Sequence, residues 1–181
     1  MPQQHARIQH EAEPKEGYIS KLIAQGEHQQ LDFKFGVNDS RKIARTLAAF
    51  ANTDGGRLLI GVKDNGSIAG VRSEEEFYML QAASEMFTRP AVPFEVKEWT
   101  INQKRVLEVI VPAIKGVLHS APVEKDNYLI YIRVKDENYT VNSVWLKAYK
   151  WRNSPSGTFI RFGENEKFLL DYLEKEPGIT Q

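Results

Sequence analysis

The chain has 181 residues, 41% of them hydrophobic and 27% charged, with 24 basic residues against 24 acidic ones. These proportions are typical of an ordinary globular domain, and the zero net charge supplies no long-range attraction for nucleic acid. No apolar run reaches the roughly 18 residues that a membrane helix needs, and the absence of cysteine excludes disulfides and thiolate chemistry. We therefore expect a cytoplasmic protein with no membrane contact.

The first third of the chain predicts a helix, a strand and a longer helix. Residues 1–16 are polar and are expected to form a disordered lead. A short helix is predicted at 18–23, and the alternation of apolar and charged residues over 31–35 predicts a half-buried strand. Asp39 and its neighbours can cap the next helix, which apolar residues at helical spacing carry as far as two glycines. Those apolar residues are Ile43, Leu47 and Phe50.

The middle of the chain predicts mostly strands. Residues 57–62 are apolar on both faces and are expected to lie centrally in a sheet, and the turn at Asn65-Gly66 should return the chain as a partner strand over 67–71. A second main helix is predicted at 74–88. A hairpin with strands 94–101 and 105–111 and a further strand at 128–134 follow. This order predicts an α+β fold with a mixed sheet and two main helices.

The C-terminal region is expected to form a separate element. Residues 145–153 fit either a helix or an extended segment, and 164–173 have the spacing of a helix. The following Pro177-Gly178 resembles the way in which winged-helix modules continue after their first helix. We therefore predict a main domain over 17–153, with 154–181 forming a linker and the first helix of a truncated winged helix.

Two blocks of the sequence and one later strand carry a resemblance to a known family. The blocks are Glu27-x4-Asp32-Phe33-Lys34 and 49–71, which opens Ala-Phe-Ala-Asn-Thr-Asp-Gly-Gly, and the strand is Tyr131-Ile132-Arg133-Val134. They are similar to the Schlafen-type, AlbA-like domain, a family described as DNA-binding and once grouped with divergent ATPases. The resemblance implies the mixed α+β fold and nucleic acid as the partner. Bacterial members often carry a winged helix after this domain in transcriptional regulators, which implies the same setting here.

In animal Schlafens the same fold carries a metal-dependent ribonuclease site of three carboxylates. The resemblance implies that the matching residues here are Glu27, Asp32 and Asp64, which would hold Mg²⁺ or Mn²⁺ through oxygen ligands. The chain departs from the family in having Asp32 where glutamate is usual. The alternative is that Asp32 pairs with Lys34 on a strand and that Asp64 only builds the turn. No cofactor is expected unless the nuclease interpretation holds.

The segment Asn52-Thr53-Asp54-Gly55-Gly56 has two interpretations. It can form a backbone nest for phosphate, or it can be a structural turn in which Asn52, Asp54 and the glycines end a helix. A phosphate cradle usually leads from a strand into a helix, and here the order is reversed. The segment also lacks the Gly-Lys-Ser/Thr ending of a P-loop, so ATP is not an expected ligand.

Two basic segments are candidates for contact with phosphate. Arg41, Lys42 and Arg45 begin the predicted helix, and with Lys34 on the strand before it they either contact phosphates or form an ordinary solvated face. Residues 145–153 interleave aromatic side chains with Lys147, Lys150 and Arg152. Those aromatic side chains either stack on bases or pack against the sheet or a second copy of the chain.

Three functions follow from these observations. The first is a nucleic-acid-binding module, most simply for DNA, in a bacterial transcriptional regulator or a defence-related protein. The second is a metal-dependent endoribonuclease that uses the three carboxylates, although we do not expect an enzyme. The third is a dimerising scaffold, and a homodimer is the expected assembly. The sequence leaves open whether the nucleic acid is DNA or RNA.

Overall fold

The computed structural model describes residues 8–10, 17–124, 127–153 and 163–175. The chain divides into two compact units, residues 1–141 and residues 142–181, and each is described by itself. The predicted boundaries at residues 16 and 153 stay predictions. Within the predicted lead, the structure describes only the short strand at 8–10.

Five strands form the larger sheet of the first unit, in the order β1-β4-β5-β3-β2. β2 runs parallel to β3 and β1 runs parallel to β4, whereas β5 is antiparallel to both of its neighbours, so the sheet is mixed. Its strands are β1 (Ile8–His10), β2 (Leu31–Lys34), β3 (Gly56–Ile60), β4 (Glu95–Ile101) and β5 (Lys104–Val111).

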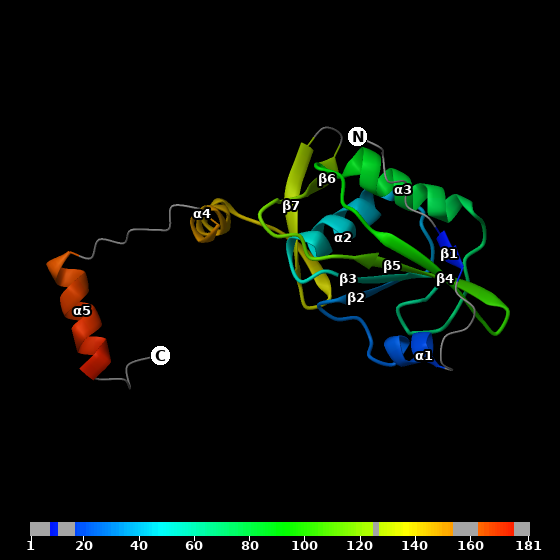
Figure 1. Ribbon diagram of the computed structural model, residues 1–181, viewed down its shortest axis with the longest axis horizontal. Coiled ribbons are helices and arrows are strands. Elements are labelled where there is room, and N and C mark those ends of the chain that lie inside the picture. The colour runs from blue at the N-terminus through cyan, green and yellow to red at the C-terminus, as the bar shows by residue number, and fades with distance from the viewer. Residues whose placement is uncertain (1–7, 11–16, 125–126, 154–162, 176–181) are drawn as a thin grey trace. The chain divides into compact units, whose positions relative to one another are not determined.

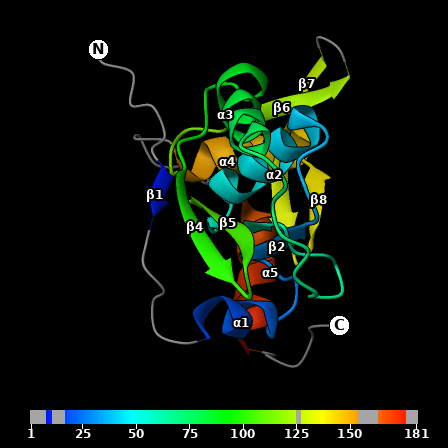
Figure 2. The same cartoon turned by 90° about the vertical axis from the view of Figure 1, so that its right-hand side faces the viewer.

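Helices cover both faces of this sheet, as Figures 1 and 2 show. The helices α2 (Ser40–Asn52) and α3 (Glu75–Phe87) pack on one face, where they meet the buried side chains of Leu58 and Ile60. The short helix α1 (Tyr18–Ile23) packs on the other face against Leu59, because successive side chains of a strand point to opposite faces. The central strand β3 is therefore apolar on both faces, as the sequence predicts.

A second, antiparallel sheet covers the other side of α2. Its order is β6-β7-β8, with β6 (Ser120–Glu124), β7 (Asn127–Val134) and β8 (Glu137–Thr140). Ala121 of β6 and Tyr131 of β7 belong to the same buried cluster as the apolar face of α2. The helix is thus enclosed between two sheets, which accounts for its small residues Ala44, Ala48 and Ala51, all fully buried.

The predicted α+β class with a mixed sheet and two main helices is confirmed, and so is the β4–β5 hairpin, in which Asn102 and Gln103 both have positive φ. The partner strand predicted at 67–71 is wrong. The structure has only an isolated bridge between Val62 and Ile68. β3 ends at Ile60 because Gly61 takes φ +94°, which turns the chain out of the sheet before a ladder can form.

The second unit contains α4 (Ser143–Arg152) and α5 (Glu164–Lys175). The ambiguous segment at 145–153 is therefore helical, and Asn142 caps its first turn by accepting a hydrogen bond from the amide of Trp145 at 2.9 Å. The helix predicted at 164–173 is present as α5. The predicted Pro177-Gly178 continuation of a winged helix lies outside the described residues.

Candidate nucleic-acid interface

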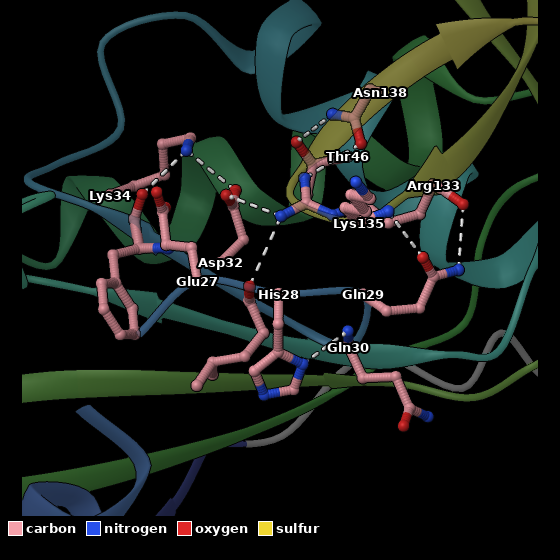
Figure 3. A network of polar contacts seen from close by, with 12 residues as sticks. Glu27, His28, Gln29, Gln30, Asp32, Lys34, Thr46, Arg133, Lys135 and Asn138 are labelled. Carbon is pink, nitrogen blue, oxygen red and sulfur yellow. Dashed lines mark hydrogen bonds and ion pairs between the residues drawn. The ribbon is translucent and has the colours of Figure 1, made fainter. Parts of the chain in front are cut away.

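Asp32 lies on β2 with its carboxylate buried between two cations (Figure 3). Its Oδ2 is 2.8 Å from Nζ of Lys34, and its Oδ1 is 3.1 Å from Nη2 of Arg133. Lys34 also donates a hydrogen bond to the carbonyl of Phe33 at 2.7 Å. The single charge of Asp32 is therefore compensated by two positive charges from the protein itself, which explains how it tolerates burial.

Arg133 comes from β7 and joins the second sheet to the first. Besides Asp32, its guanidinium donates to the carbonyl of Leu31 at 3.4 Å and to Oδ1 of Asn138 at 3.1 Å, and it lies 5.2 Å from the ring centroid of Phe50. Only 2% of Arg133 is exposed. A planar guanidinium with several donors suits such a buried site better than an ammonium group.

Glu27 lies beside this pair (Figure 3), just before β2. Its Oε1 accepts a hydrogen bond from the amide of Phe33 at 2.8 Å. Burial raises the pKa of Glu27, and its contact with the Asp32 carboxylate raises it further, against the lowering effects of the Phe33 amide and of Lys34. The structure thus brings together two of the three carboxylates predicted to hold a metal.

Asp64, the third, lies in the exposed turn after β3. Among the residues that the structure describes, no group of three or more histidine or acidic side chains is placed so that it could hold a metal ion. The donors also do not fit a hard cation, because Asp32 is already matched by Lys34 and Arg133 and the pKa of Glu27 is raised. No catalytic step through a metal follows from this arrangement, and the nuclease role of these residues stays a prediction.

The Asn-Thr-Asp part of the 52–56 segment faces the backbone of the second sheet. The side-chain amide of Asn52 donates to the carbonyls of His119 and Tyr131, both at 2.8 Å, and its Oδ1 accepts from the amide of His119 at 2.7 Å. Thr53 Oγ1 accepts from the amide of Arg133 at 3.0 Å. The side chain of Asp54 accepts from Gln29 at 3.0 Å. Asn52 and Thr53 are therefore engaged within the fold, whereas Asp54 makes its contact with Gln29 at the surface.

The two glycines of the segment allow close approach of backbone and ring. Gly55 has φ +70°, and a Cβ atom there would lie 2.7 Å from the carbonyl oxygen of Val111. A Cβ atom on Gly56 would lie 2.6 Å from the ring of Phe50. The amide of Gly55 donates to the carbonyl of Phe50 at 2.9 Å, as in a helix C-terminal cap. The geometry thus assigns this segment to the end of α2, with its amides turned into the fold.

The predicted basic helix face separates into two kinds of residue. Arg41 and Lys42 are exposed in the first turn of α2, with the Arg41 guanidinium 5.6 Å from the ring of Phe87. Arg45 instead donates to the carbonyls of Pro122 and Val123 at 2.8 and 2.7 Å, which ties α2 to β6. Lys34 is similarly occupied by Asp32. Of this set, Arg41 and Lys42 are exposed, whereas Arg45 is partly buried and Lys34, with 38% of its side chain exposed, is paired with Asp32.

The remaining predicted cations, Lys147, Lys150 and Arg152, lie on α4 in the second unit and are exposed. No residue of this helix is buried. The rings of Trp145 and Tyr149 stack on each other with centroids 5.3 Å apart. The segment therefore presents positive charge and aromatic surface on one helix.

A family model for the domain described as Schlafen, AlbA_2 matches residues 27–142, which is more than half of the chain. The chain belongs to the Schlafen, AlbA_2 family. The matched region runs from Glu27, before β2, to Asn142, two residues after β8, so it includes the Asp32–Arg133 pair and the 52–56 segment. No curated protein matches the chain.

Two solved structures are similar to this Schlafen, AlbA_2 chain. The crystal structure of the DIP2311 protein from Corynebacterium diphtheriae has a TM-score of 0.52 and 20% identity, and the match covers 78% of this chain but only 28% of that protein. The solution structure of the N-terminal domain of a RecG-related protein from Nitrosomonas europaea has a TM-score of 0.41 and 19% identity, covering 69% of this chain and 92% of that domain. The first shows a shared fold.

No helix in the described part of the chain is long and apolar enough to cross a membrane.

Sequence reasoning missed two features of this Schlafen, AlbA_2 domain. The first is the role of Arg133 as the partner of Asp32, which a basic residue among the apolar residues of β7 could have indicated. The second is the surface at Phe35, whose exposed ring has Arg72 and Lys63 nearby. The alternation over 31–35 places Phe35 on a strand, whereas β2 ends at Lys34 and leaves this ring in the connection to α2.

Proposed function

We propose that this chain is a nucleic-acid-binding module, that DNA is its target, and that it serves in a bacterial transcriptional regulator. Membership of the Schlafen, AlbA_2 family supports nucleic acid as the partner, because the sequence resemblance to this family implies a DNA-binding domain. The exposed cations Arg41 and Lys42 support phosphate as the group that is contacted.

The start of α2 is the observation that carries this proposal. Its first turn contains no acidic residue, and Arg41 and Lys42 are exposed there. A helix N-terminus carries a partial positive charge, so cations at this end destabilise the helix by about 0.3–1 kcal/mol each. Asp39 caps this terminus, with its carboxylate accepting from the amide of Arg41 at 2.9 Å and its carbonyl accepting from the amide of Lys42 at 3.2 Å. The side chains of Arg41 and Lys42, rather than free amides, are therefore the groups that we expect to contact phosphate. Binding of an anion such as phosphate would explain why Arg41 and Lys42 occupy positions where they lower the stability of the helix.

The other cations divide by the contacts that they make. Lys34 and Arg45 hold the fold through Asp32 and the β6 carbonyls, so we expect them to contribute little to phosphate binding. Lys147, Lys150 and Arg152 are exposed on α4, whose sequence from Ser143 to Arg152 contains no acidic residue. We expect these three to add further phosphate contacts.

Substitution of Lys42 tests the proposal, because binding and stability should change in opposite directions. Lys42→Glu places an acidic residue at the helix N-terminus and should raise the melting temperature slightly. The same change should weaken binding to a labelled DNA duplex and reduce the slope of log K against log[salt] by about 1 or more. Fluorescence anisotropy across a salt titration measures both quantities.

The control is Lys115→Glu, because Lys115 is exposed in the connection between β5 and β6 and its substitution changes the net charge by the same amount. Binding that weakens equally in both variants would show only an effect of net charge. A wild-type chain that binds no duplex, or whose binding does not change with salt, would contradict the proposal.

A further inference from the structure

An exposed aromatic ring with two cations beside it lies at the end of β2. Phe35 is 41% exposed although it follows directly on a buried strand. Cζ of Arg72 lies 5.0 Å from the centroid of the ring, and Nζ of Lys63 lies 5.8 Å from it. Arg72 and Lys63 are also exposed. The ring is therefore accessible, and both charges beside it can be reached from solvent.

The fold places this group at the carboxyl ends of two parallel strands. β2 and β3 run parallel, and the amide of Gly61, just after β3, donates to the carbonyl of Lys34 at 2.8 Å. Residues that follow the two strands, Phe35 and Lys63, must then emerge at the same edge of the sheet. This edge is where sheets with parallel strands commonly receive their ligands.

Arg72 is held at this edge by a buried carboxylate. Oε2 of Glu76 accepts hydrogen bonds from the amides of Arg72 and Ser73 at 3.1 and 3.2 Å. Glu76 is buried at the start of α3. The carboxylate therefore fixes the backbone from which the guanidinium reaches the Phe35 ring. A supported aromatic ring and a supported cation form a more precise binding surface than two side chains on free loops.

Packing alone does not account for the arrangement of Phe35, Arg72 and Lys63. A phenylalanine that served only the core would be buried as Phe33 is, at 1% exposed, two residues earlier. Cations beside an exposed ring gain only about 0.5–1 kcal/mol from it, so the arrangement adds little to stability. A nucleobase, in contrast, offers a flat face to the ring and a phosphate on either side to the cations.

We propose that Phe35 stacks against an unpaired nucleobase, while Arg72 and Lys63 contact the phosphates that flank it. The base takes the place of the Lys63 ammonium, the more distant and more flexible of the two cations, and Arg72 keeps its position beside the ring. The ligand class is therefore a single-stranded segment, because the bases of an intact duplex are stacked on each other and expose only their edges. This inference rests on the proposed nucleic-acid binding and specifies its substrate.

Asp64 opposes this assignment, because it is exposed and follows Lys63 directly, and Glu74 and Glu75 are exposed acidic residues close to Arg72 in the sequence. The charge of Asp64 should repel the incoming phosphate, so Asp64→Asn should raise the affinity for a single strand. If Asp64 instead held a metal ion that bridged to phosphate, Asp64→Asn should lower this affinity. Glu76 does not act in the same way, because its carboxylate is buried and bonded to two amides.

The test compares two replacements of the ring in the full chain. Phe35→Leu keeps an apolar side chain of similar size and removes the aromatic face, whereas Phe35→Tyr keeps the face. Labelled single strands of DNA and RNA with one sequence, and a blunt DNA duplex, are titrated by fluorescence anisotropy. We expect Phe35→Leu to weaken single-strand binding by about 5- to 150-fold and Phe35→Tyr to change it by less than about 3-fold, with duplex binding nearly unchanged in both.

The outcomes separate this inference from the proposed function. A loss in Phe35→Leu that is confined to DNA or to RNA single strands supports the inference and identifies the preferred sugar. Single-strand affinity that is unchanged in Phe35→Leu, or lost equally in Phe35→Tyr, would overturn the inference and leave phosphate binding by α2 intact. A wild-type chain that binds no duplex would contradict the proposed function itself, whatever its affinity for the two single strands. The melting temperature of each variant shows whether it is folded.

Discussion

Nη2 of Arg133 on β7 lies 3.1 Å from Oδ1 of Asp32 on β2, and both residues are almost completely buried. The pair connects the two sheets that enclose α2. Loss of one member leaves the other as a buried charge, whereas loss of both removes the charges together. The stability of the contact between the sheets should therefore depend on the pair as a unit.

Replacement of Arg133 by methionine should lower the free energy of unfolding by about 3 kcal/mol, because Asp32 then keeps only Lys34 as its partner. The double variant Arg133→Met with Asp32→Leu should recover a large part of that loss. Urea denaturation of the wild type, both single variants and the double variant gives the coupling between the two residues. A double variant that is no more stable than Arg133→Met would contradict the interpretation.

The pH dependence of stability should show the raised pKa of Glu27. A carboxyl group whose pKa is higher in the folded state than the ordinary value of 4.5 binds its proton more tightly when folded. Stability is therefore highest when the group is protonated and is lost as pH rises through the raised pKa. Glu27→Gln should remove this loss, because its amide oxygen can still accept the hydrogen bond from Phe33.

Urea denaturation of the wild type and of Glu27→Gln at several pH values from 4 to 8 checks this prediction. The variant should gain stability relative to the wild type as pH rises. A wild type that gains relative to the variant would show instead that the charged carboxylate stabilises the fold.

Divalent cations should leave the melting temperature unchanged within about 1 °C, because the charge of Asp32 is already compensated and Asp64 lies apart in its turn. A metal that bound the folded chain at 100 times its Kd would add about 2.7 kcal/mol and raise the melting temperature by several degrees. Thermal denaturation with Mg²⁺, Mn²⁺ or EDTA measures the shift. A rise that disappears in both Asp32→Asn and Asp64→Asn would support the nuclease interpretation.

Gly55→Ala should destabilise the protein far more than Gly116→Ala. Both glycines have positive φ, +70° and +83°, so the backbone strain of the substitution is similar and amounts to about 1–2 kcal/mol. Only at position 55 would the new Cβ atom meet backbone, 2.7 Å from the carbonyl oxygen of Val111, whereas at position 116 nothing lies within 4 Å. Equal losses in the two variants, measured by urea denaturation, would show that the close approach contributes nothing.

The fold was largely predictable from the sequence because its elements have strong local signals. Apolar spacing and Asp39 define α2, and Asn102-Gln103 marks the β4–β5 hairpin. The return strand at 67–71 failed because an Asn-Gly turn says nothing about Gly61, whose positive φ ends β3 first. The local sequence predicts the turn, but it does not show that β5 already pairs with β3 along the edge that a return strand would need.

The candidate site was less predictable because its contacts join distant parts of the chain. Asp32 and Lys34 are close in sequence, and their pairing was one of the two alternatives considered. Arg133 is 101 residues from Asp32. Its place among the apolar residues of β7 indicates a buried cation, but nothing in the local sequence identifies Asp32 as its partner. Likewise Arg72 reaches Phe35 only because Glu76 fixes its backbone, a contact that depends on how α3 packs.

The hydrogen bonds at the end of α2 also bear on which positions can change in evolution. Asn52 and Thr53 bond to the main chain at His119, Tyr131 and Arg133, and a main-chain group remains when its side chain is replaced. Substitutions along β7 can therefore accumulate without breaking this contact, whereas a substitution of Asn52 removes it. The constraint is one-sided, because it falls on the side chains of Asn52 and Thr53 and not on the side chains of the residues whose main chain they contact.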